Sequence, residues 1–230
     1  MKLSDKVVVV TGSGGALGQA VAATLSAYGA RLALLDHSPA PETARVPGAL
    51  HYGGVDLTQD DAARSVMGRV FKDTGRIDVL INVAGGFRWE KLAGGTLEHW
   101  DSMYRLNLRT AVASCQAALP YLLQSGGGRI VNVAAMAAGH AAAGMGAYAA
   151  SKAGVAKLTE ALADELKDRH ITVNAILPST LDTPRNRLDM PDADFTRWVA
   201  PADAAAVIAF LVSDEARAVT GALIPVVGRL

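Results

Sequence analysis

Cysteine is almost absent from this chain, since Cys115 is the only one among 230 residues. A single cysteine excludes an internal disulfide framework. Cys115 lies in the apolar run 111–119, where a thiol is more often a small buried hydrophobic group than a nucleophile. We therefore expect Cys115 to be buried and chemically inert.

An excess of charge of either sign is missing as well. The chain has 22 basic and 22 acidic side chains, so its formal net charge is zero. A protein that binds nucleic acid usually carries a basic excess to displace counterions, so no nucleic-acid partner is expected. Zero net charge together with 50% hydrophobic residues leaves little repulsion between copies. Part of the apolar surface is therefore predicted to be a subunit interface.

Long apolar runs and a leader-like N-terminus are also lacking. No stretch of about 18 residues is free of charges and helix breakers, so a membrane span is not expected. Residues 1–6 have no signal-peptide pattern, which favours a soluble, cytoplasmic protein. The spacing of the histidines predicts no metal site; these are His37, His51, His99 and His170.

What the sequence does contain is a regular alternation of apolar runs and helical patterns. The apolar runs are nearly continuous, as in strands that are buried on both faces. Strands are predicted at 7–10, 31–35, 50–55, 77–83, 129–134, 171–177 and 222–227. Helices are predicted at 17–28, 59–72, 96–126 with an interruption near Asn107, 148–168 and 201–213. This pattern is typical of an α/β fold with a doubly wound parallel sheet, here as one domain over 1–230.

One segment of the chain fits no regular pattern. Residues 178–200 follow the sixth predicted strand and are rich in Pro, Asp and Arg. Long loops at strand ends are usually functional. We expect this segment, called the substrate loop below, to cover a small-molecule substrate.

The first strand passes directly into the glycine-rich segment Thr11 to Gly18 and then into a helix. Glycines let a backbone approach a pyrophosphate, and a helix N-terminus supplies free N–H groups and partial positive charge. An acid, Asp36, follows at the end of the second strand, so the pattern predicts a dinucleotide site rather than a tight turn without a ligand. The predicted contacts in this loop are Gly12, Gly15, Ala16, Leu17 and Gly18.

The ends of the next strands extend this predicted cofactor site. Asp36 can accept hydrogen bonds from both ribose hydroxyls and would repel a 2′-phosphate, and no Arg or Lys follows within several residues. NAD(H) is therefore favoured over NADP(H). Asp56 and Leu57 either flank the adenine ring or form an ordinary helix N-cap. After the fourth strand, small residues allow a cofactor to lie against the backbone, in the run that contains Asn82, Ala84 and Gly85.

Tyr148 and Lys152 stand four residues apart in a predicted helix, so they share one face, one turn apart. An ordinary tyrosine has a pKa near ~10 and exchanges protons poorly at neutral pH. A nearby ammonium group favours the phenolate, so we expect Lys152 to lower the pKa of Tyr148. The phenol can then give a proton to a carbonyl or take one from an alcohol. A solvated helix face is the alternative for an isolated pair.

The order of these motifs resembles that of the short-chain dehydrogenase/reductase family, over essentially the whole chain. The motifs that carry the resemblance are Gly12…Gly18, Asn82–Gly85, Asn107, Tyr148…Lys152 and Pro178…Thr183. This resemblance implies a seven-stranded Rossmann fold, NAD(P)-dependent carbonyl/alcohol chemistry and a homotetramer or homodimer. It implies Tyr148 as the acid/base, Lys152 as the group that holds the nicotinamide ribose, and Asn107 as the anchor of a proton-relay water. Further cofactor contacts are implied at Pro178, Leu181 and Thr183, with Thr183 on the carboxamide.

Three departures from the family pattern stand out. The middle glycine of the first motif is Ala16, and the Pro-Gly after the sixth strand is Pro178-Ser179. The position of the family's catalytic serine, thirteen residues before Tyr148, is Ala135. Losing one such donor can cost roughly 10²–10³ in rate. The reaction is therefore easier, another donor serves, or the protein is a catalytically silent NAD(H)-binding sensor or scaffold subunit.

The segment that begins at Leu181, with its Asp-Thr-Pro-Arg sequence, resembles the dihydropteridine reductase subgroup of the family. That resemblance implies NADH-dependent reduction of an electrophilic quinonoid substrate, for which a missing serine matters less. The other pocket candidates are His140, either a substitute donor or a solvent-exposed histidine; Trp89, a stacking platform or a packing residue; and Trp198, an anchor of the substrate loop.

The predicted helix from Tyr148 carries several alanines. In the family this helix commonly packs against the same helix of a partner subunit. The resemblance therefore implies a subunit interface along a small-residue face made of Ala149, Ala153, Ala156 and Ala161.

Overall fold

The computed structural model describes residues 1–39 and 46–230, and it contains one seven-stranded sheet with all its pairs parallel. The strand order is β3-β2-β1-β4-β5-β6-β7. The strands are β1 (Val7–Thr11), β2 (Arg31–Leu35), β3 (Leu50–Tyr52), β4 (Val79–Asn82), β5 (Gly128–Val133), β6 (Ile171–Pro178) and β7 (Leu223–Val226). The predicted doubly wound parallel sheet is confirmed.

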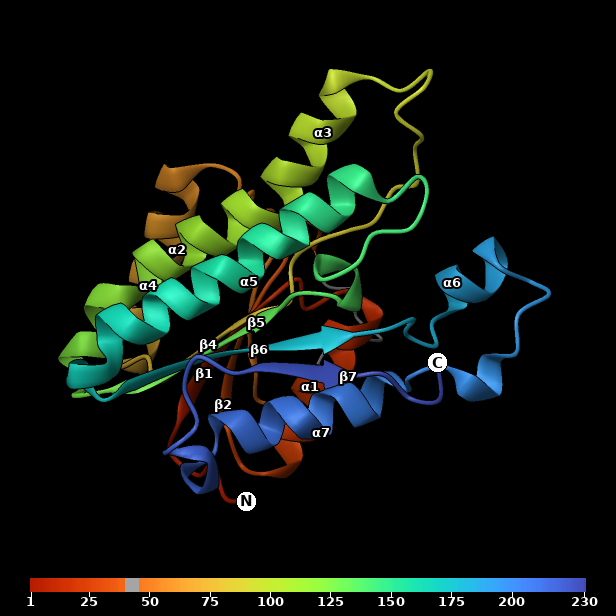
Figure 1. The fold of residues 1–230 in the computed structure, drawn as a ribbon. Helices are drawn as coiled ribbons and strands as arrows, with labels where there is room; N and C mark the ends of the chain where they lie inside the picture. Colours follow the sequence, from red (N-terminus) through yellow and green to blue (C-terminus); the bar gives the residue numbers. More distant parts are fainter. Residues whose placement is uncertain (40–45) are drawn as a thin grey trace.

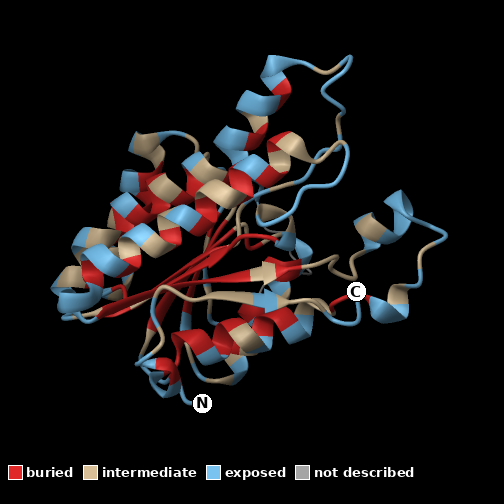
Figure 2. Cartoon of the chain, in the orientation of Figure 1, coloured by how far each residue is buried: buried red, intermediate tan, exposed pale blue. Residues whose placement is uncertain are grey.

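Helices cover both faces of the sheet (Figure 1). One face carries α1 (Ala16–Ala27) and α7 (Pro201–Val212); the other carries α2 (Asp60–Thr74), α4 (Thr110–Gln124) and α5 (Gly146–Leu166). Successive side chains of a strand point to opposite faces, so Val7 and Val9 enter one core cluster while Val8 and Val10 enter the other. Figure 2 shows the buried strands between helices whose outer faces are exposed.

The long helix predicted over 96–126 consists of three pieces. It begins as α3 (Leu97–Met103), where the Thr96 side chain accepts a hydrogen bond from the His99 N–H at 3.2 Å. It continues as a π-helix over Tyr104–Arg109 and then becomes α4. The predicted interruption near Asn107 is confirmed, and its form is a π-helix, which is rare and frequent at functional sites.

A chain of buried polar side chains crosses the sheet. Asn82 Nδ2 donates to Asn132 Oδ1 at 2.9 Å, and Asn132 Nδ2 donates to Thr159 Oγ1 at 2.9 Å. Asn82 Nδ2 also lies 3.3 Å from the sulfur of Cys115. Cys115 is buried, as predicted, and burial raises the pKa of its thiol to about 12.

The structure differs from the prediction in one strand boundary and in one helix that was not predicted. The third strand ends at Tyr52 rather than Val55, because Gly53 and Gly54 follow and Gly54 has φ +72°. The substrate loop contains the short helix α6 (Pro184–Asp189). Its N-cap is Thr183, whose hydroxyl accepts the Asn186 N–H at 3.2 Å, and the Thr-Pro pair was a readable helix-start signal.

The small-residue face predicted on α5 is only partly correct. Ala149 and Ala156 are buried inside the subunit, Ala153 is half-buried, and Ala161 is exposed. Ala149, Ala153 and Ala156 share one side of the helix, but that side is mostly turned into the subunit, and Ala161 lies on a different side. None of the helices in the described part of the chain is long and apolar enough to cross a bilayer.

Candidate active site

Most of the predicted site residues gather near the carboxyl ends of β1, β2, β4, β5 and β6. The strand order changes direction between β1 and β4, and in open α/β sheets ligands bind in the crevice at such a switch point. The loops that leave these strand ends, including the substrate loop, surround this edge of the sheet (Figure 1).

The glycine-rich loop is packed so closely that two of its glycines are required. Gly12 has φ +64°, and a Cβ there would lie 2.7 Å from the Cα of Ala84. A Cβ on Gly18 would collide with the Gly12 carbonyl oxygen and lie 2.7 Å from the Ser13 Cα. The loop is thereby held flat against the end of β4 and against its own helix.

The start of α1 is open to a ligand. Gly15 is the N-cap and offers no side chain, and both Gly15 and Ala16 are exposed. The first turn of this helix contains no acidic residue, and its N–H groups have no partners within the helix. Leu17 is buried in the core and fixes the helix to the sheet. This terminus can therefore receive an anionic group such as a pyrophosphate.

Asp36 connects the end of β2 to the glycine-rich loop. Its Oδ2 accepts the Gly14 N–H at 2.8 Å and its Oδ1 accepts the Ser38 N–H at 2.9 Å. An ionised carboxylate has about four acceptor sites, so two bonds leave capacity for ribose hydroxyls. The residues of the loop, the helix terminus and Asp36 together fit a dinucleotide.

Asp56 was predicted either to flank the adenine ring or to form a helix N-cap, and the structure excludes the N-cap. The N-cap of α2 is Gln59, and Asp56 instead accepts bonds from the N–H (2.9 Å) and hydroxyl (2.7 Å) of Thr58. These bonds hold the pKa of Asp56 below its usual range. Leu57 packs in the hydrophobic core.

The end of β4 brings three predicted residues together. The Asn82 side chain is turned into the sheet, so only its backbone faces the site, and the Ala84 N–H donates to Thr11 Oγ1 at 3.2 Å. Gly85 is exposed, and a Cβ there would lie 2.6 Å from Asn107 Oδ1 and 3.2 Å from Lys152 Nζ. Gly85, Asn107 and Lys152 therefore converge on one point.

Asn107 is held by the π-helix with its amide fully engaged. Its Oδ1 accepts the Gly86 N–H at 2.9 Å, and its Nδ2 donates to the Gly86 carbonyl and to Ser151 Oγ, both at 3.0 Å. Ser151 in turn donates to the carbonyl of Tyr148 at 2.7 Å. Sequence reasoning missed Ser151; its place three residues after Tyr148, on the same helical face, was the available signal.

Lys152 is buried, with 5% of its surface exposed, and its ammonium donates to the Val133 carbonyl at 2.8 Å. Burial lowers the pKa of Lys152 to about 8. The expectation that Lys152 lowers the pKa of Tyr148 was wrong for the protein chain alone, because burial raises the pKa of Tyr148 to about 12. The phenol is therefore protonated at neutral pH.

Ala135 is the second residue after β5, close to the strand end as predicted for the position of the family serine. Its backbone is extended, with φ −164° and ψ 157°, and it is 5% exposed. Met136–Ala138 then form one 3₁₀ turn. Residues 134–138, which follow β5, therefore have no side-chain hydroxyl to offer to the site.

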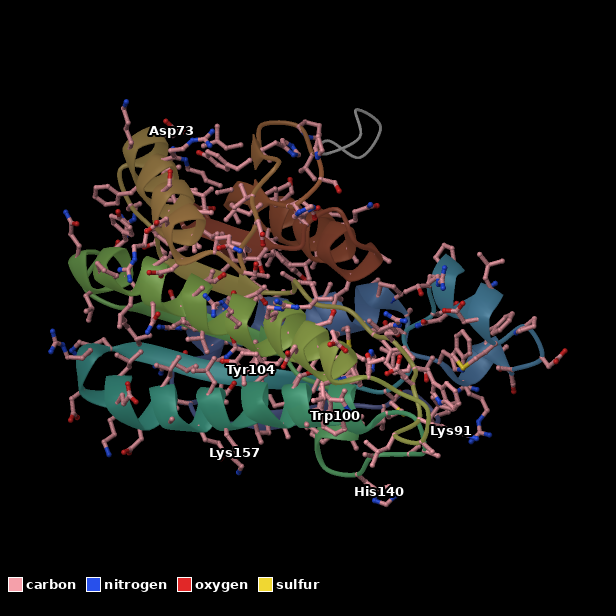
Figure 3. All side chains as sticks on the ribbon, turned by 90° about the horizontal axis from the view of Figure 1, so that it is seen from above. Asp73, Lys91, Trp100, Tyr104, His140 and Lys157 are labelled. Carbon is pink, nitrogen blue, oxygen red and sulfur yellow. The ribbon has the colours of Figure 1, made fainter. Side chains whose placement is uncertain are left out.

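The predicted pocket residues have different environments. His140 is exposed and points outward from its loop (Figure 3), so the solvent-exposed interpretation is the one supported. Trp89 is 54% exposed, and its Nε1 donates to the Ala143 carbonyl at 2.9 Å. Trp198 is buried beside Phe195, with ring centroids 4.8 Å apart, which agrees with an anchor of the substrate loop.

Of the residues predicted after β6, Pro178 ends the strand and Leu181 forms a parallel bridge with Val199. Thr183 is half-buried and caps α6 through its hydroxyl. Ser179, which replaces a family glycine, donates its hydroxyl to the Val227 carbonyl at 2.9 Å. Among residues 1–39 and 46–230, no three His, Cys, Asp or Glu side chains form a group that could hold a metal ion.

Comparison with known proteins agrees with this geometry. A family model described as short chain dehydrogenase matches residues 6–193. The chain is 34% identical to the 3-oxoacyl-[acyl-carrier-protein] reductase FabG of Thermotoga maritima, over 100% of this chain and 99% of that protein. It is also 34% identical to an NAD-dependent glycerol dehydrogenase of Listeria innocua, over 95% and 91% of the two chains. The solved structure of an NAD⁺-bound xylitol dehydrogenase superposes with a TM-score of 0.90 at 27% identity, over 99% of this chain and 100% of that one.

Proposed function

The chain belongs to the short-chain dehydrogenase family of oxidoreductases, and on that premise we propose that it transfers a hydride between a nicotinamide dinucleotide and a small carbonyl, alcohol or quinonoid substrate. The observation that carries this proposal is the convergence of Asn107 and Lys152 at Gly85, with Tyr148 one helical turn from Lys152. In this proposal Tyr148 exchanges the proton with the substrate oxygen.

The cofactor in this proposal is NAD(H) rather than NADP(H). Gly15 and Ala16 would hold the pyrophosphate at the start of α1, and the carboxylate of Asp36 would hold the adenosine ribose and repel a 2′-phosphate. When bound, this cofactor supplies or accepts the hydride. Two relatives whose names include NAD, the glycerol and xylitol dehydrogenases, support the same choice.

In this proposal Tyr148 donates the proton in carbonyl reduction. Burial raises the pKa of the phenol to about 12 in the chain without cofactor, so the phenol is protonated at neutral pH. Efficient donation then requires that its pKa falls when cofactor and substrate are bound. Lys152 would hold the nicotinamide ribose with the N–H groups that the Val133 carbonyl leaves free. Asn107 and Ser151 fix the backbone around both residues.

Ala135 limits the substrates that this machinery can serve. Without a hydroxyl at this position, the substrate oxygen loses a donor worth roughly 10²–10³ in rate. An electrophilic substrate, such as an activated ketone or a quinonoid dihydropterin, needs that donor least. The local resemblance of the Leu181–Arg187 segment to the dihydropteridine reductase subgroup supports this class.

The test is the variant Tyr148→Phe, assayed by NADH oxidation with a panel of ketones, quinones and quinonoid dihydropterin. Removing the hydroxyl should lower kcat by roughly 10²–10⁴, the usual contribution of general acid–base catalysis. The affinity for NADH, measured by fluorescence titration, should remain unchanged. Tyr28→Phe, at the far end of α1, is the control that removes an equivalent hydroxyl outside the site. Full turnover by Tyr148→Phe would refute the proposal.

A second function, a catalytically silent NAD(H)-binding sensor or scaffold, is favoured by one observation, the absent hydroxyl at Ala135. The retained trio of Tyr148, Lys152 and Asn107 disfavours it, because a silent protein has no need of a proton donor and its support. Robust turnover of any substrate in the same panel eliminates this alternative.

A further inference from the structure

Large apolar side chains are exposed around the candidate active site. They lie on three segments that leave the sheet at its carboxyl edge, after β4, β5 and β6 (Figure 1). Exposed apolar groups concentrated in one region usually mark a binding surface. We call these residues the apolar rim; they are Phe87, Trp89, Met136, Leu188 and Met190.

The apolar rim begins at the reacting phenol itself. The ring of Phe87 meets the ring of Tyr148 edge-on, with centroids 5.0 Å apart and an interplanar angle of 85°. This is a favoured geometry for an aromatic pair. Phe87 is nevertheless 52% exposed, so the rest of its surface is free to contact a molecule held at the Tyr148 hydroxyl.

The loop that carries Phe87 is fixed in place. Trp89 Nε1 donates to the Ala143 carbonyl, and the Glu90 N–H donates to the Gly144 carbonyl, both at 2.9 Å. Gly144 has φ +77° and lies directly under the Trp89 ring, where a side chain would collide. The only polar group of Trp89 is thereby used within the protein, and its ring remains as an apolar surface.

Two arginine–carboxylate pairs of the substrate loop are formed within the loop. Arg187 donates to both carboxylate oxygens of Asp182, at 2.6 and 2.8 Å, and Arg185 donates to Asp189 at 2.9 Å. Among the large side chains at the end of α6, Leu188 and Met190 remain exposed, at 78% and 41%.

The segment after β5 offers equally little polarity. Between residues 134 and 147 the only polar side chain is that of His140, which points outward to solvent (Figure 3). The surroundings of Tyr148 therefore contain many apolar contacts and few side-chain partners for hydroxyl groups.

We propose that the substrate is an uncharged apolar ring compound, a cyclic ketone or its secondary alcohol, and not a polyhydroxylated one; this rests on the proposed oxidoreductase function. In reduction, the carbonyl carbon gains a hydride from NADH and the carbonyl oxygen gains the proton of Tyr148. The C=O double bond becomes a C–OH single bond, and NADH is oxidised to NAD⁺. An apolar ring gains free energy when the rim removes it from water, whereas each buried hydroxyl of a polyol would lack a partner.

The test compares kcat/KM of the purified full-length chain for cyclohexanone and dihydroxyacetone with NADH, and for cyclohexanol and glycerol with NAD⁺. The ring compounds should be preferred at least ~100-fold in both directions, since unpaired buried hydroxyls are strongly rejected. An equal or higher kcat/KM for the polyol pair, or for quinonoid dihydropterin, overturns this inference and leaves the proposed function standing. Turnover of none of these substrates overturns both.

Variants of the apolar rim give a second readout. Phe87→Ser and Leu188→Ser should each raise KM for cyclohexanone roughly tenfold, the effect of losing an apolar pocket contact. Their affinity for NADH should be unchanged. The matched control is Phe210→Ser, which removes an exposed phenylalanine from α7, outside the three segments. If the rim variants behave like Phe210→Ser, the apolar rim does not bind the substrate and the inference is wrong.

Discussion

Lys152 and Tyr148 show how burial alone can reverse the simplest expectation for a residue pair. Four-residue spacing on a helix correctly predicts that the two share a face, but it does not indicate how much water each one loses. The folded chain buries Lys152 and much of Tyr148, so burial disfavours the charged form of both: it lowers the pKa of the lysine and raises that of the phenol. The predicted pKa of Tyr148 was wrong for this reason.

This burial predicts a pH dependence of stability. The pKa of Lys152 is about 8 in the folded protein and 10.5 when unperturbed, so between these values the unfolded chain binds more protons. Stability should then rise with pH across this window, by about 1.4 kcal/mol per pH unit and about 3 kcal/mol in total. Below pH 8 the full cost of burying the ammonium is present.

Urea unfolding of the wild type and of Lys152→Met at several pH values measures this effect. The difference in free energy of unfolding, wild type minus variant, should increase from pH 8 to 10.5. Tyr148 titrates in both proteins and cancels in the difference. Lys157→Met, which removes an exposed lysine from the same helix, is the control variant. Parallel curves for wild type and Lys152→Met would contradict the assigned burial cost.

At the scale of elements, sequence periodicity predicted the sheet, the flanking helices and even the interruption near Asn107. It did not predict α6, because six residues are too few to show a helical period and the Thr183-Pro184 start signal was overlooked. Nor did it predict the pairing of the loops after β4 and β5. That contact joins Trp89 to Ala143, which are 54 residues apart, and no local pattern encodes it.

The contact between these two loops can be tested through Gly144. Gly144→Ala should destabilise the protein by about 1–3 kcal/mol, because alanine is strained at φ +77° and its methyl group would displace the Trp89 ring. Thermal unfolding measures the loss. The matched control is Gly139→Ala in the same loop, where φ is −91° and a Cβ would meet only the Met136 carbonyl, at 3.8 Å. Equal stability of the two variants would contradict the argument.

For the whole molecule, composition and order of motifs indicated the class, the family and the ligand-binding edge, because these depend on patterns repeated along the chain. The chemical character of the pocket depends instead on which side chains are left unpaired once the chain has folded. Asp182 and Arg187 read as polar loop residues in the sequence, yet they neutralise each other and leave Leu188 exposed. The apolar rim was therefore hidden until the structure was known.

Association of copies is the prediction that belongs to this scale. Light scattering after size exclusion at neutral pH should give two or four times the mass of one chain. Ala161→Arg, on the exposed side of α5, should shift the protein towards the monomer by placing a charge in the interface. Ala202→Arg, exposed on α7, is the control. A wild-type monomer, or a mass that Ala161→Arg leaves unchanged, would contradict the predicted interface.

The π-helix over Tyr104–Arg109 limits what can be removed from this helix. A π-turn contains one residue more than an α-helical turn, so α3 and α4 are out of phase by about 100° around the axis. Deleting one residue, such as Leu106, would let the helix close into regular α-helix with better backbone geometry. The same deletion would rotate Asn107 relative to Gly86 and Ser151 and separate it from both. The longer, less regular helix is therefore the condition for holding one amide in place.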